Sequence, residues 1–370
     1  MSHLYIVGLP HTKLDDFTYS ACAFTAKTVR WTRILQKIDQ DFTVFWGGSE
    51  AAENLGENEF ISCLNDEEQE LFFGKWDAGV LPVVEWQAGL PYWRIFHDRI
   101  ADTLRKRIRP GDMIAIVGGA ISQEIVDEFK NYICIEPGVG YEGICQGTFA
   151  CFESYAWLHH TYGRYGIHDG RYFDTVIPNS YEPGDFYVGE SEDYALFVGR
   201  LIARKSPDVA GLIAKELGIP LKVAGAGMQR IEGDKIIATD GTVIEGEYVG
   251  SVNPAERASL MAGAKLFICP TRYIGPFEGV HVESMFSGVM PIGPDYGVFT
   301  ETLDEAFRFR NLQEAVKAAE AAMRVNSTER RRELTRAMAV GRFSLDAASV
   351  LYHQWFYNLS KLTKKGWYEL

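Results

Sequence analysis

The sequence lacks the features that mark several specialised classes of protein. No run approaches the roughly 18 to 20 apolar residues of a membrane-spanning helix, and the first residues lack the charged and then apolar build of a signal peptide. The six cysteines form no CxxC pair, so neither a zinc site nor a disulfide framework is predicted. The 36 glycines and 14 prolines are too few for a collagen or a linker protein. A cytoplasmic globular protein is expected.

Positive charge is also in short supply. Lysine and arginine total 37 against 50 aspartates and glutamates, which gives a net charge of −13. Because basic side chains supply most of the affinity for nucleic acids, general electrostatic binding to DNA is disfavoured, although a local basic groove is compatible with the composition. Hydrophobic residues make up 46% of the chain and charged residues 24%, as in soluble globular proteins. The length of 370 residues predicts two domains.

Short apolar segments alternate with helical patterns, which favours parallel sheets covered by helices on both faces. Strands are predicted in the first half at residues 4–8, 42–46, 112–117 and 132–135. Strands are predicted in the second half at 194–198, 221–224, 248–249 and 266–269, with a polar hairpin at 234–242. The segment 166–192 is rich in Gly, Pro, Asp and Tyr, as is typical of a linker. The predicted domains are therefore 1–185 and 186–343.

Two helix starts carry their own signals. Asn253 suits an N-cap, Pro254 suits the first helical position, and Glu256 can complete a capping box. Ser344 is suited to cap a final amphipathic helix at 344–362.

Two glycine turns in the second half are suited to phosphates or a base. Phe197-Val-Gly-Arg200-Leu-Ile-Ala-Arg-Lys205 predicts a strand, a turn and two cations just before a helix begins at Pro207. Arg200, Lys205 and the partial positive charge of the helix terminus can together hold a diphosphate. Leu221-Lys-Val-Ala-Gly225-Ala-Gly227 is a strand and a tight turn that a base or phosphate can approach. Taken singly, each motif is better explained by an ordinary surface loop.

The segment from Pro270 to Gly288 is the most informative. Its loop contains Gly279, which exposes backbone N–H groups, and a helix carrying Glu283 follows. A carboxylate can accept two hydroxyl hydrogen bonds at once, as recognition of a ribose requires. Composition alone favours the alternative, a solvated glutamate in the first turn of a helix.

Taken together and in this order, five segments across residues 194–302 resemble the donor-binding half of glycosyltransferase family 4, the retaining nucleotide-sugar enzymes with the GT-B fold. The segments are FVGRLIARK, LKVAGAG, EYVGSVNPAERASLMAGAKLFICPT, RYIGPFEGVHVESMFSG and GPDYGVFTET. In the first half, GLPHT, CAFTAKTVR, GVGYEG and FESYAWLHHTYG resemble a subgroup found in bacteria and their viruses. The resemblance implies two Rossmann-like α/β domains facing across a cleft, with a C-terminal helix at 344–370 packing back on the first domain. A viral member would act in the host cytoplasm.

The resemblance also implies a reaction. Arg200 and Lys205 would neutralise the diphosphate of a nucleotide-sugar donor as the sugar leaves, and Glu283 would bind the ribose. Retention is described in the family as front-face substitution, in which a donor phosphate oxygen helps to remove the acceptor proton. Neither a protein nucleophile, a metal nor a cofactor is implied, and the nucleotide sugar is a co-substrate.

Further donor-side candidates are implied by position in the matched segments. Those expected to lie against the phosphate and sugar are Gly279, Val280 and His281. Those expected near the base are Gly225, Gly227, Gly250 and Val252, and Gly8 at the first β-α turn is a donor-side candidate in the first domain.

The chain departs from the family at one position. The paired-glutamate motif places a glutamate eight residues before Glu283, but residue 275 is glycine. In relatives that carboxylate touches sugar hydroxyls. Its absence implies a different donor sugar, a substitute such as Glu278, or a weakened or lost activity. The alternative to an enzyme is thus a non-catalytic protein that binds sugar nucleotides.

The acceptor is a hydroxyl compound: a saccharide, a lipid-linked molecule or, if the viral resemblance holds, a hydroxymethylated base in DNA. The acceptor-side candidates, all in predicted loops of the first half, are His11, Glu136, Tyr141 and Glu142. Cations that could form a local groove for DNA are Lys27, Arg30, Arg33, Arg94, Arg99, Arg105, Lys106, Arg107 and Arg109. The base and sugar of the donor, the acceptor and the oligomeric state are not specified by the sequence.

Overall fold

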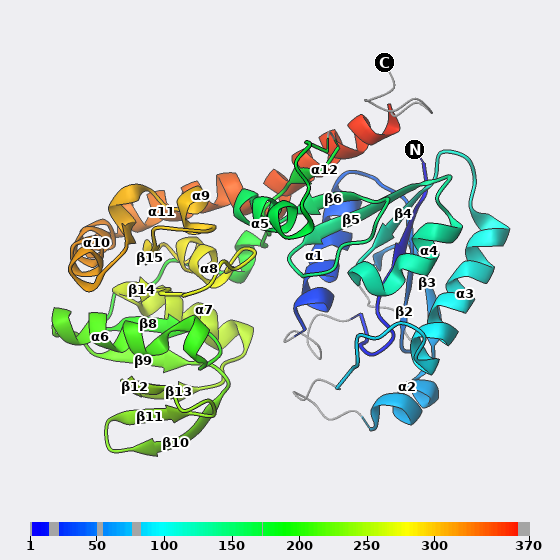
Figure 1. Ribbon diagram of the computed structural model, residues 1–370. Coiled ribbons are helices and arrows are strands. Elements are labelled where there is room, and N and C mark those ends of the chain that lie inside the picture. Colours follow the sequence, from blue (N-terminus) through cyan, green and yellow to red (C-terminus); the bar gives the residue numbers. More distant parts are fainter. Residues whose placement is uncertain (1, 15–21, 50–54, 76–82, 172, 362–370) are drawn as a thin grey trace. The chain divides into compact units, whose positions relative to one another are not determined.

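The computed structural model in Figure 1 describes residues 2–14, 22–49, 55–75, 83–171 and 173–361. The described residues form two compact units. Unit 1 draws on the segments Met1–Glu153, Thr161–Asn179 and Ala348–Leu370, and unit 2 on Ser154–His160 and Ser180–Ala347.

Unit 1 is built on a parallel sheet with the strand order β3-β2-β1-β4-β5-β6-β7. Its strands are β1 (Leu4–Val7), β2 (Phe42–Gly47), β3 (Glu59–Leu64), β4 (Met113–Ile116), β5 (Ile133–Val139), β6 (Phe149–Phe152) and β7 (Thr175–Val176). All residues of β1, β2 and β4 are buried. Because helices cover both faces of the sheet, these strands are continuous apolar runs and do not alternate.

Helices flank the sheet of unit 1, with α1 on one face and α3 and α4 on the other (Figure 1). They are α1 (Ala23–Lys37), α2 (Asp66–Phe73), α3 (Pro91–Arg107), the 3-10 turn η2 (Gly119–Ser122) and α4 (Gln123–Glu128). The last residues of α5 (Tyr155–Tyr165) also belong to unit 1, and its first residues belong to unit 2. The end of α12 (Leu345–Ser360) completes the unit. Trp355 of α12 donates from Nε1 to the carbonyl of Phe173 (2.8 Å), and the ring of Tyr352 lies 6.0 Å from that of Trp31 in α1.

Unit 2 has a second parallel sheet, in the order β13-β9-β8-β14-β15-β16, and a small antiparallel sheet, β10-β11-β12. The parallel strands are β8 (Ala195–Val198), β9 (Leu221–Ala224), β13 (Glu247–Gly250), β14 (Leu266–Ile268), β15 (Pro291–Pro294) and β16 (Arg308–Phe309). The antiparallel strands are β10 (Met228–Glu232), β11 (Lys235–Ala238) and β12 (Val243–Glu245). The predicted hairpin at 234–242 is therefore the middle of a three-stranded meander that begins earlier.

The helices of unit 2 pack on its parallel sheet. They are α6 (Pro207–Leu217), α7 (Pro254–Gly263), α8 (Val280–Phe286), α9 (Phe299–Thr302), α10 (Leu312–Val325) and α11 (Glu329–Phe343), with 3-10 turns η3 (Pro183–Asp185), η4 (Ala203–Lys205) and η5 (Glu305–Phe307). The predicted capping box is confirmed, since Asn253 accepts from Glu256 N–H and the Glu256 side chain accepts from Asn253 N–H. The predicted cap at Ser344 is also confirmed, because its hydroxyl accepts from Ala347 N–H (3.1 Å).

Candidate functional site

Two loops that carry predicted residues meet at one edge of the unit 2 sheet. The loop after β8 holds Arg200 and Lys205, and the loop after β14 runs through residues 269–279. Because β8 lies between β9 and β14, these loops leave the sheet where the strand order reverses, which is where α/β sheets bind ligands. A backbone hydrogen bond from Arg272 N–H to the Arg204 carbonyl (2.9 Å) joins the two loops.

Lys205 is held by an ion pair. Its Nζ lies 2.5 Å from Oε2 of Glu278, and the side chains are 18% and 3% exposed. Thr271 donates its hydroxyl to the same oxygen (3.2 Å). The ring of Tyr273 lies 5.2 Å from Lys205 Nζ and 4.8 Å from Arg204 Cζ. Burial alone would lower the pKa of Lys205, but the charge of Glu278, aided by Tyr273, raises that pKa above its ordinary value.

Arg200, the other predicted phosphate ligand, is exposed. Within the described part of the chain, no side-chain hydrogen bond or ion pair engages its guanidinium. Ser206 links η4 to α6 in the left-handed conformation, with φ of 57°. The Ala203 N–H donates to the carboxylate of Asp240 (2.7 Å), which ties this loop to the turn between β11 and β12. Arg200 is thus available to a ligand, whereas Lys205 already has a partner.

Glu278 occupies an unusual backbone conformation. Its φ of 59° is left-handed, which costs a residue with a Cβ about 1 to 2 kcal/mol. The Glu278 carbonyl accepts from Nδ1 of His281 (2.5 Å) and from the His281 backbone N–H (3.3 Å). The other ring nitrogen, Nε2, lies 2.8 Å from the hydroxyl oxygen of Thr302. Burial lowers the pKa of His281 to about 4, so a neutral imidazole holds this turn.

The Glu278 carboxylate fills the space beside Gly275. A Cβ at position 275 would lie 2.3 Å from Oε1, 2.9 Å from Cγ and 3.0 Å from Cδ of Glu278. These distances are shorter than close packing allows. The backbone of Gly275 is outside the left-handed region, so a side chain at this position is opposed by the Glu278 side chain and not by backbone conformation.

Glu283 of α8 is paired with Arg257 of α7. Its Oε2 lies 2.8 Å from Nε of Arg257, and the side chains are 10% and 29% exposed. Neither of these two atoms has a well-aligned hydrogen bond among the described residues, so proximity of charge defines the contact. Arg257 was not identified from the sequence, because nothing distinguishes it from an ordinary surface arginine in the first turns of a helix.

The start of α8 lies against Tyr181. A Cβ at Gly279 would be 2.0 Å from the Tyr181 hydroxyl, so glycine lets the two approach. His281 is fully buried, while Val280 and Val252 are half-buried. Tyr181, like Thr271 and Tyr273, was not found by sequence reasoning, since it lies in the predicted linker.

The turn glycines explain how the loops after β8 and β9 fit together. Gly225 has φ of 141°, and a Cβ there would lie 1.9 Å from the Gly199 carbonyl oxygen. Gly227 has φ of 109° and lies close to the backbone of Leu201. Gly250 has φ of 96° and faces open space among the described residues. Side chains at these positions would force the loops apart or strain the backbone.

In unit 1, His11 follows β1 and is buried among aromatic rings. It is 7% exposed, and the rings of Phe73, Trp86 and Trp93 lie edge-on at 6.1, 5.8 and 6.5 Å. Burial lowers the pKa of His11 to about 4. Its Nδ1 is buried and has no hydrogen-bond partner among the described residues. The imidazole is therefore neutral, and its proposed contact with an acceptor stays a prediction.

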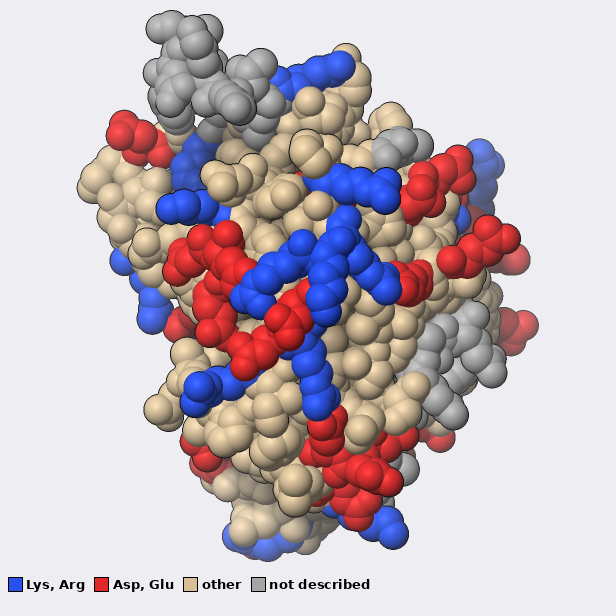
Figure 2. All heavy atoms as spheres, turned by 90° about the vertical axis from the view of Figure 1, so that its right-hand side faces the viewer, with Lys and Arg blue, Asp and Glu red and all other residues tan. Residues whose placement is uncertain are grey.

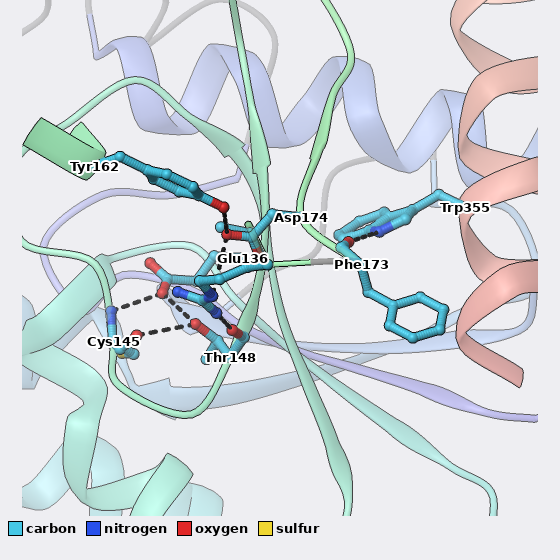
Figure 3. A network of polar contacts seen from close by, with 9 residues as sticks. Glu136, Cys145, Thr148, Tyr162, Phe173, Asp174 and Trp355 are labelled. Atoms are coloured by element: carbon cyan, nitrogen blue, oxygen red, sulfur yellow. Dashed lines mark hydrogen bonds and ion pairs between the residues drawn. The ribbon is translucent and has the colours of Figure 1, made fainter. Parts of the chain in front are cut away.

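Figure 3 shows that Glu136 is the centre of a buried network. Its Oε1 accepts from Cys145 N–H (2.6 Å) and from the Thr148 hydroxyl (2.7 Å). Its Oε2 accepts from the Tyr141 hydroxyl (2.7 Å). Glu136 has no exposed surface, and burial raises its pKa to about 7 in spite of these hydrogen bonds. The carboxylate thus binds the loop that follows β5 back onto the strand. Its proposed contact with an acceptor, and that of Tyr141, stays a prediction.

The other unit 1 candidates have different surroundings. Glu142 is exposed and pairs with Arg164 (3.0 Å). Gly8 lies against Trp46, whose ring would be 1.8 Å from a Cβ at position 8. Packing against Trp46 therefore accounts for glycine at this turn without any ligand.

Several cations that could form a groove for DNA are balanced by carboxylates. The pairs on α3 are Arg99 with Glu68, Arg105 with Glu128 and Arg107 with Glu59, each at 2.6 Å. Figure 2 shows this face, with acidic and basic side chains next to one another. Lys27 of α1 pairs with Glu153. These four cations are therefore balanced by neighbouring carboxylates.

No helix in the described ranges is long and apolar enough to cross a membrane. All six cysteines are buried and unpaired, and burial raises the pKa of Cys63, Cys134, Cys151 and Cys269 to about 12.

Comparison with known proteins identifies the fold. No protein-family profile matches the sequence, and no curated protein matches it. Among solved structures, sucrose-phosphate synthase from Thermosynechococcus elongatus is similar, with a TM-score of 0.64, 14% identity and coverage of 97% of this chain and 99% of that chain. A glycosyltransferase from Rickettsia africae ESF-5 gives 0.64 and 12%, covering 98% and 99%. Anabaena HepE in complex with UDP gives 0.60 and 12%, covering 98% and 100%.

These likenesses extend over nearly the whole chain and show the fold. It is the GT-B fold of glycosyltransferases, with two Rossmann-like parallel sheets. The predicted α/β fold class is confirmed.

Proposed function

We propose that this protein is a retaining glycosyltransferase, which transfers a sugar from a nucleotide-diphosphate donor to a hydroxyl acceptor. The observation that carries the proposal is the meeting of the loops after β8 and β14, where Arg200 is exposed and Lys205 lies 2.5 Å from Glu278. This meeting point of the two loops belongs to a fold shared with Anabaena HepE, which has been solved with UDP and with UDP-glucose. A nucleotide sugar is therefore the ligand that fits fold and site together.

In the proposed reaction, an acceptor hydroxyl forms a bond to the anomeric carbon from the side on which the donor phosphate leaves. The bond between that carbon and the phosphate oxygen breaks, and the acceptor proton passes to a phosphate oxygen. Arg200 and Lys205 stabilise the negative charge that grows on the diphosphate. Glu283 binds the ribose hydroxyls, with its second oxygen held by Arg257. No metal ion takes part in this scheme.

One observation, the glycine at position 275, supports an alternative function, that of a non-catalytic protein that binds sugar nucleotides. That position lacks the carboxylate that the family uses on the sugar. Binding of a sugar nucleotide without turnover of any donor would support this alternative. Hydrolysis or transfer of any donor would support the enzyme.

The acceptor is proposed only as a hydroxyl compound. The ion pairs on α3 balance three of its cations, and with the net charge of −13 they weigh against long DNA as the acceptor. A short oligonucleotide carrying hydroxymethylated bases, tested beside free saccharides, separates these acceptor classes.

The donor site can be tested directly. A panel of sugar nucleotides is screened by thermal shift, because a ligand that binds only the native state raises the melting temperature. With the donor thus identified, Arg200→Ala and Lys205→Ala should each lower transfer by about a hundredfold or more. Lys215→Ala, which removes an exposed cation of α6 paired with Glu245, is the matched control and should leave transfer unchanged. Full turnover in both site variants would remove the diphosphate assignment.

A further inference from the structure

We propose that Glu278 is a positioning residue for Lys205, and that residue 275 is glycine in order to admit its carboxylate. In the absence of donor, Glu278 fixes the ammonium group of Lys205 and balances its positive charge. When the donor binds, its diphosphate forms the ion pair with Lys205. The inference rests on the proposed function, because it assigns Lys205 to the diphosphate.

The first support is the burial of the pair. The Glu278 side chain is 3% exposed and that of Lys205 is 18% exposed, so water screens their attraction only weakly. Thr271 donates to the oxygen that Lys205 contacts, which limits the directions in which the carboxylate can turn. The ammonium therefore has one preferred place. A diphosphate that binds there must share Lys205 with an existing negative charge.

The second support is the backbone of Glu278. Glycine would adopt its φ of 59° without strain, but the chain carries a long charged residue there. The turn is held by two hydrogen bonds from His281 to the Glu278 carbonyl. Strained residues persist where the surrounding structure fixes them, and they are concentrated at functional sites.

The third support is the reciprocal relationship with Gly275. The Glu278 carboxyl group lies where a side chain at 275 would begin, so the two positions share one volume. A carboxylate can enter this volume from either position, but not from both. The Glu278 carboxylate can therefore take this position only because residue 275 is glycine. The presence of glycine at 275 does not mean that the site lacks a carboxylate.

The experiment measures nucleoside diphosphate affinity by titration calorimetry. UDP, GDP, ADP and dTDP are tested on the wild type at pH 7, and the diphosphate that binds is used for all variants. Glu278→Gln should bind it about tenfold more tightly, because the charge of Lys205 is no longer balanced. Gly275→Ala keeps every charge but displaces the carboxylate, so it should tighten binding as well, by about threefold. Glu245→Gln removes an exposed carboxylate of the same unit and should stay within about twofold of wild type.

A positional swap tests the shared volume. Glu278→Gly should bind as tightly as Glu278→Gln. The double variant G275E/E278G returns a carboxylate to the same space and should restore the wild-type affinity to within about twofold. A double variant that binds like Glu278→Gly would overturn the claim that the two positions share one carboxylate.

The pH dependence separates positioning from a purely structural role. Since Glu278 raises the pKa of Lys205 against the effect of burial, the loss of affinity at alkaline pH should move to lower pH in Glu278→Gln. Melting temperatures confirm that each variant is folded, and if Glu278→Gln does not fold, Gly275→Ala and Glu278→Gly provide the same test. Unchanged affinity in the folded variants, with a wild type that binds, would overturn the inference alone. A wild type that binds no nucleotide or sugar nucleotide would overturn the proposed function as well.

Discussion

Arg257 and Glu283 join α7 to α8 through charges 2.8 Å apart. The Glu283 side chain is 10% exposed and that of Arg257 is 29% exposed, so water screens the attraction between them only in part. In the proposed site this pair leaves Oε1 of Glu283 on the side of Gly279, where the sheet edge carries the other donor-side residues.

Arg257→Ala should therefore affect both stability and ligand binding. Removing one partner of a fully buried ion pair costs about 3 to 5 kcal/mol. Because Arg257 is 29% exposed, water can replace part of the interaction that Glu283 loses. We therefore expect the free energy of unfolding to fall by about 1 to 3 kcal/mol. Nucleoside binding should weaken, since Glu283 loses the contact that holds its side chain in place for the ribose hydroxyls. Denaturant unfolding and calorimetry measure the two effects. Arg230→Ala, an exposed arginine in the same unit, is the control, and equal behaviour of the two variants would contradict a special role for Arg257.

Glu136→Gln should change how the stability of unit 1 depends on pH. The pKa of Glu136 is raised from 4.5 to about 7 by burial, so the native state holds a proton that the unfolded chain releases between these values. The wild type therefore loses stability as the pH rises from about 4.5 to 7, by about 3 kcal/mol from this group. Glutamine stays neutral and removes that loss.

Unfolding at pH 5 and pH 8 checks the sign of this effect. The stability of Glu136→Gln relative to wild type should rise between the two pH values. Glu142→Gln, at an exposed glutamate of the same loop, should show no such rise. A parallel pH dependence in Glu136→Gln and wild type would show that Glu136 is ionised throughout.

Gly8→Ala should destabilise unit 1 through packing. The added Cβ would lie 1.8 Å from the ring of Trp46, which is fully buried, and overpacking of this kind costs about 1 to 3 kcal/mol. Gly163→Ala in α5 is the control, because no atom of the residues that the structure describes lies within 4 Å of its added Cβ. There we expect no loss of stability, or a small gain from helix propensity. Thermal melting of the two variants would distinguish packing from a general intolerance of alanine.

The sequence was sufficient to predict the central strands of unit 1 and the edge strand β13 of unit 2, but not β3, β6, β15 or β16. β1, β2 and β4 are fully buried apolar runs, and these were predicted. β3 was missed because the residues at its start are exposed or half-buried, so its sequence has no clear apolar run. The four apolar residues of β6 were not predicted as a strand, since periodicity does not separate a short buried strand from a helix.

The candidate site was predictable where its residues are neighbours in sequence. Arg200 and Lys205 stand five positions apart before a helix, so their pattern is local. The contacts of Lys205 with Glu278, and of Glu283 with Arg257, join segments that only the folded sheet brings together. The burial of Glu136 was not predictable either, because a glycine-rich loop gives no sign that its hydrogen bonds turn inward.

The discontinuity of unit 1 has a consequence for synthesis on the ribosome. Trp355 and Tyr352, which contact Phe173, Trp31 and Cys151, emerge from the ribosome only after all of unit 2. Unit 2 ends at Ala347 and can complete its core first. Unit 1, most of which is synthesised earlier, keeps the surface that α12 covers exposed until α12 has emerged. A nascent chain arrested just before α12 should therefore expose apolar surface near its beginning and not near its end.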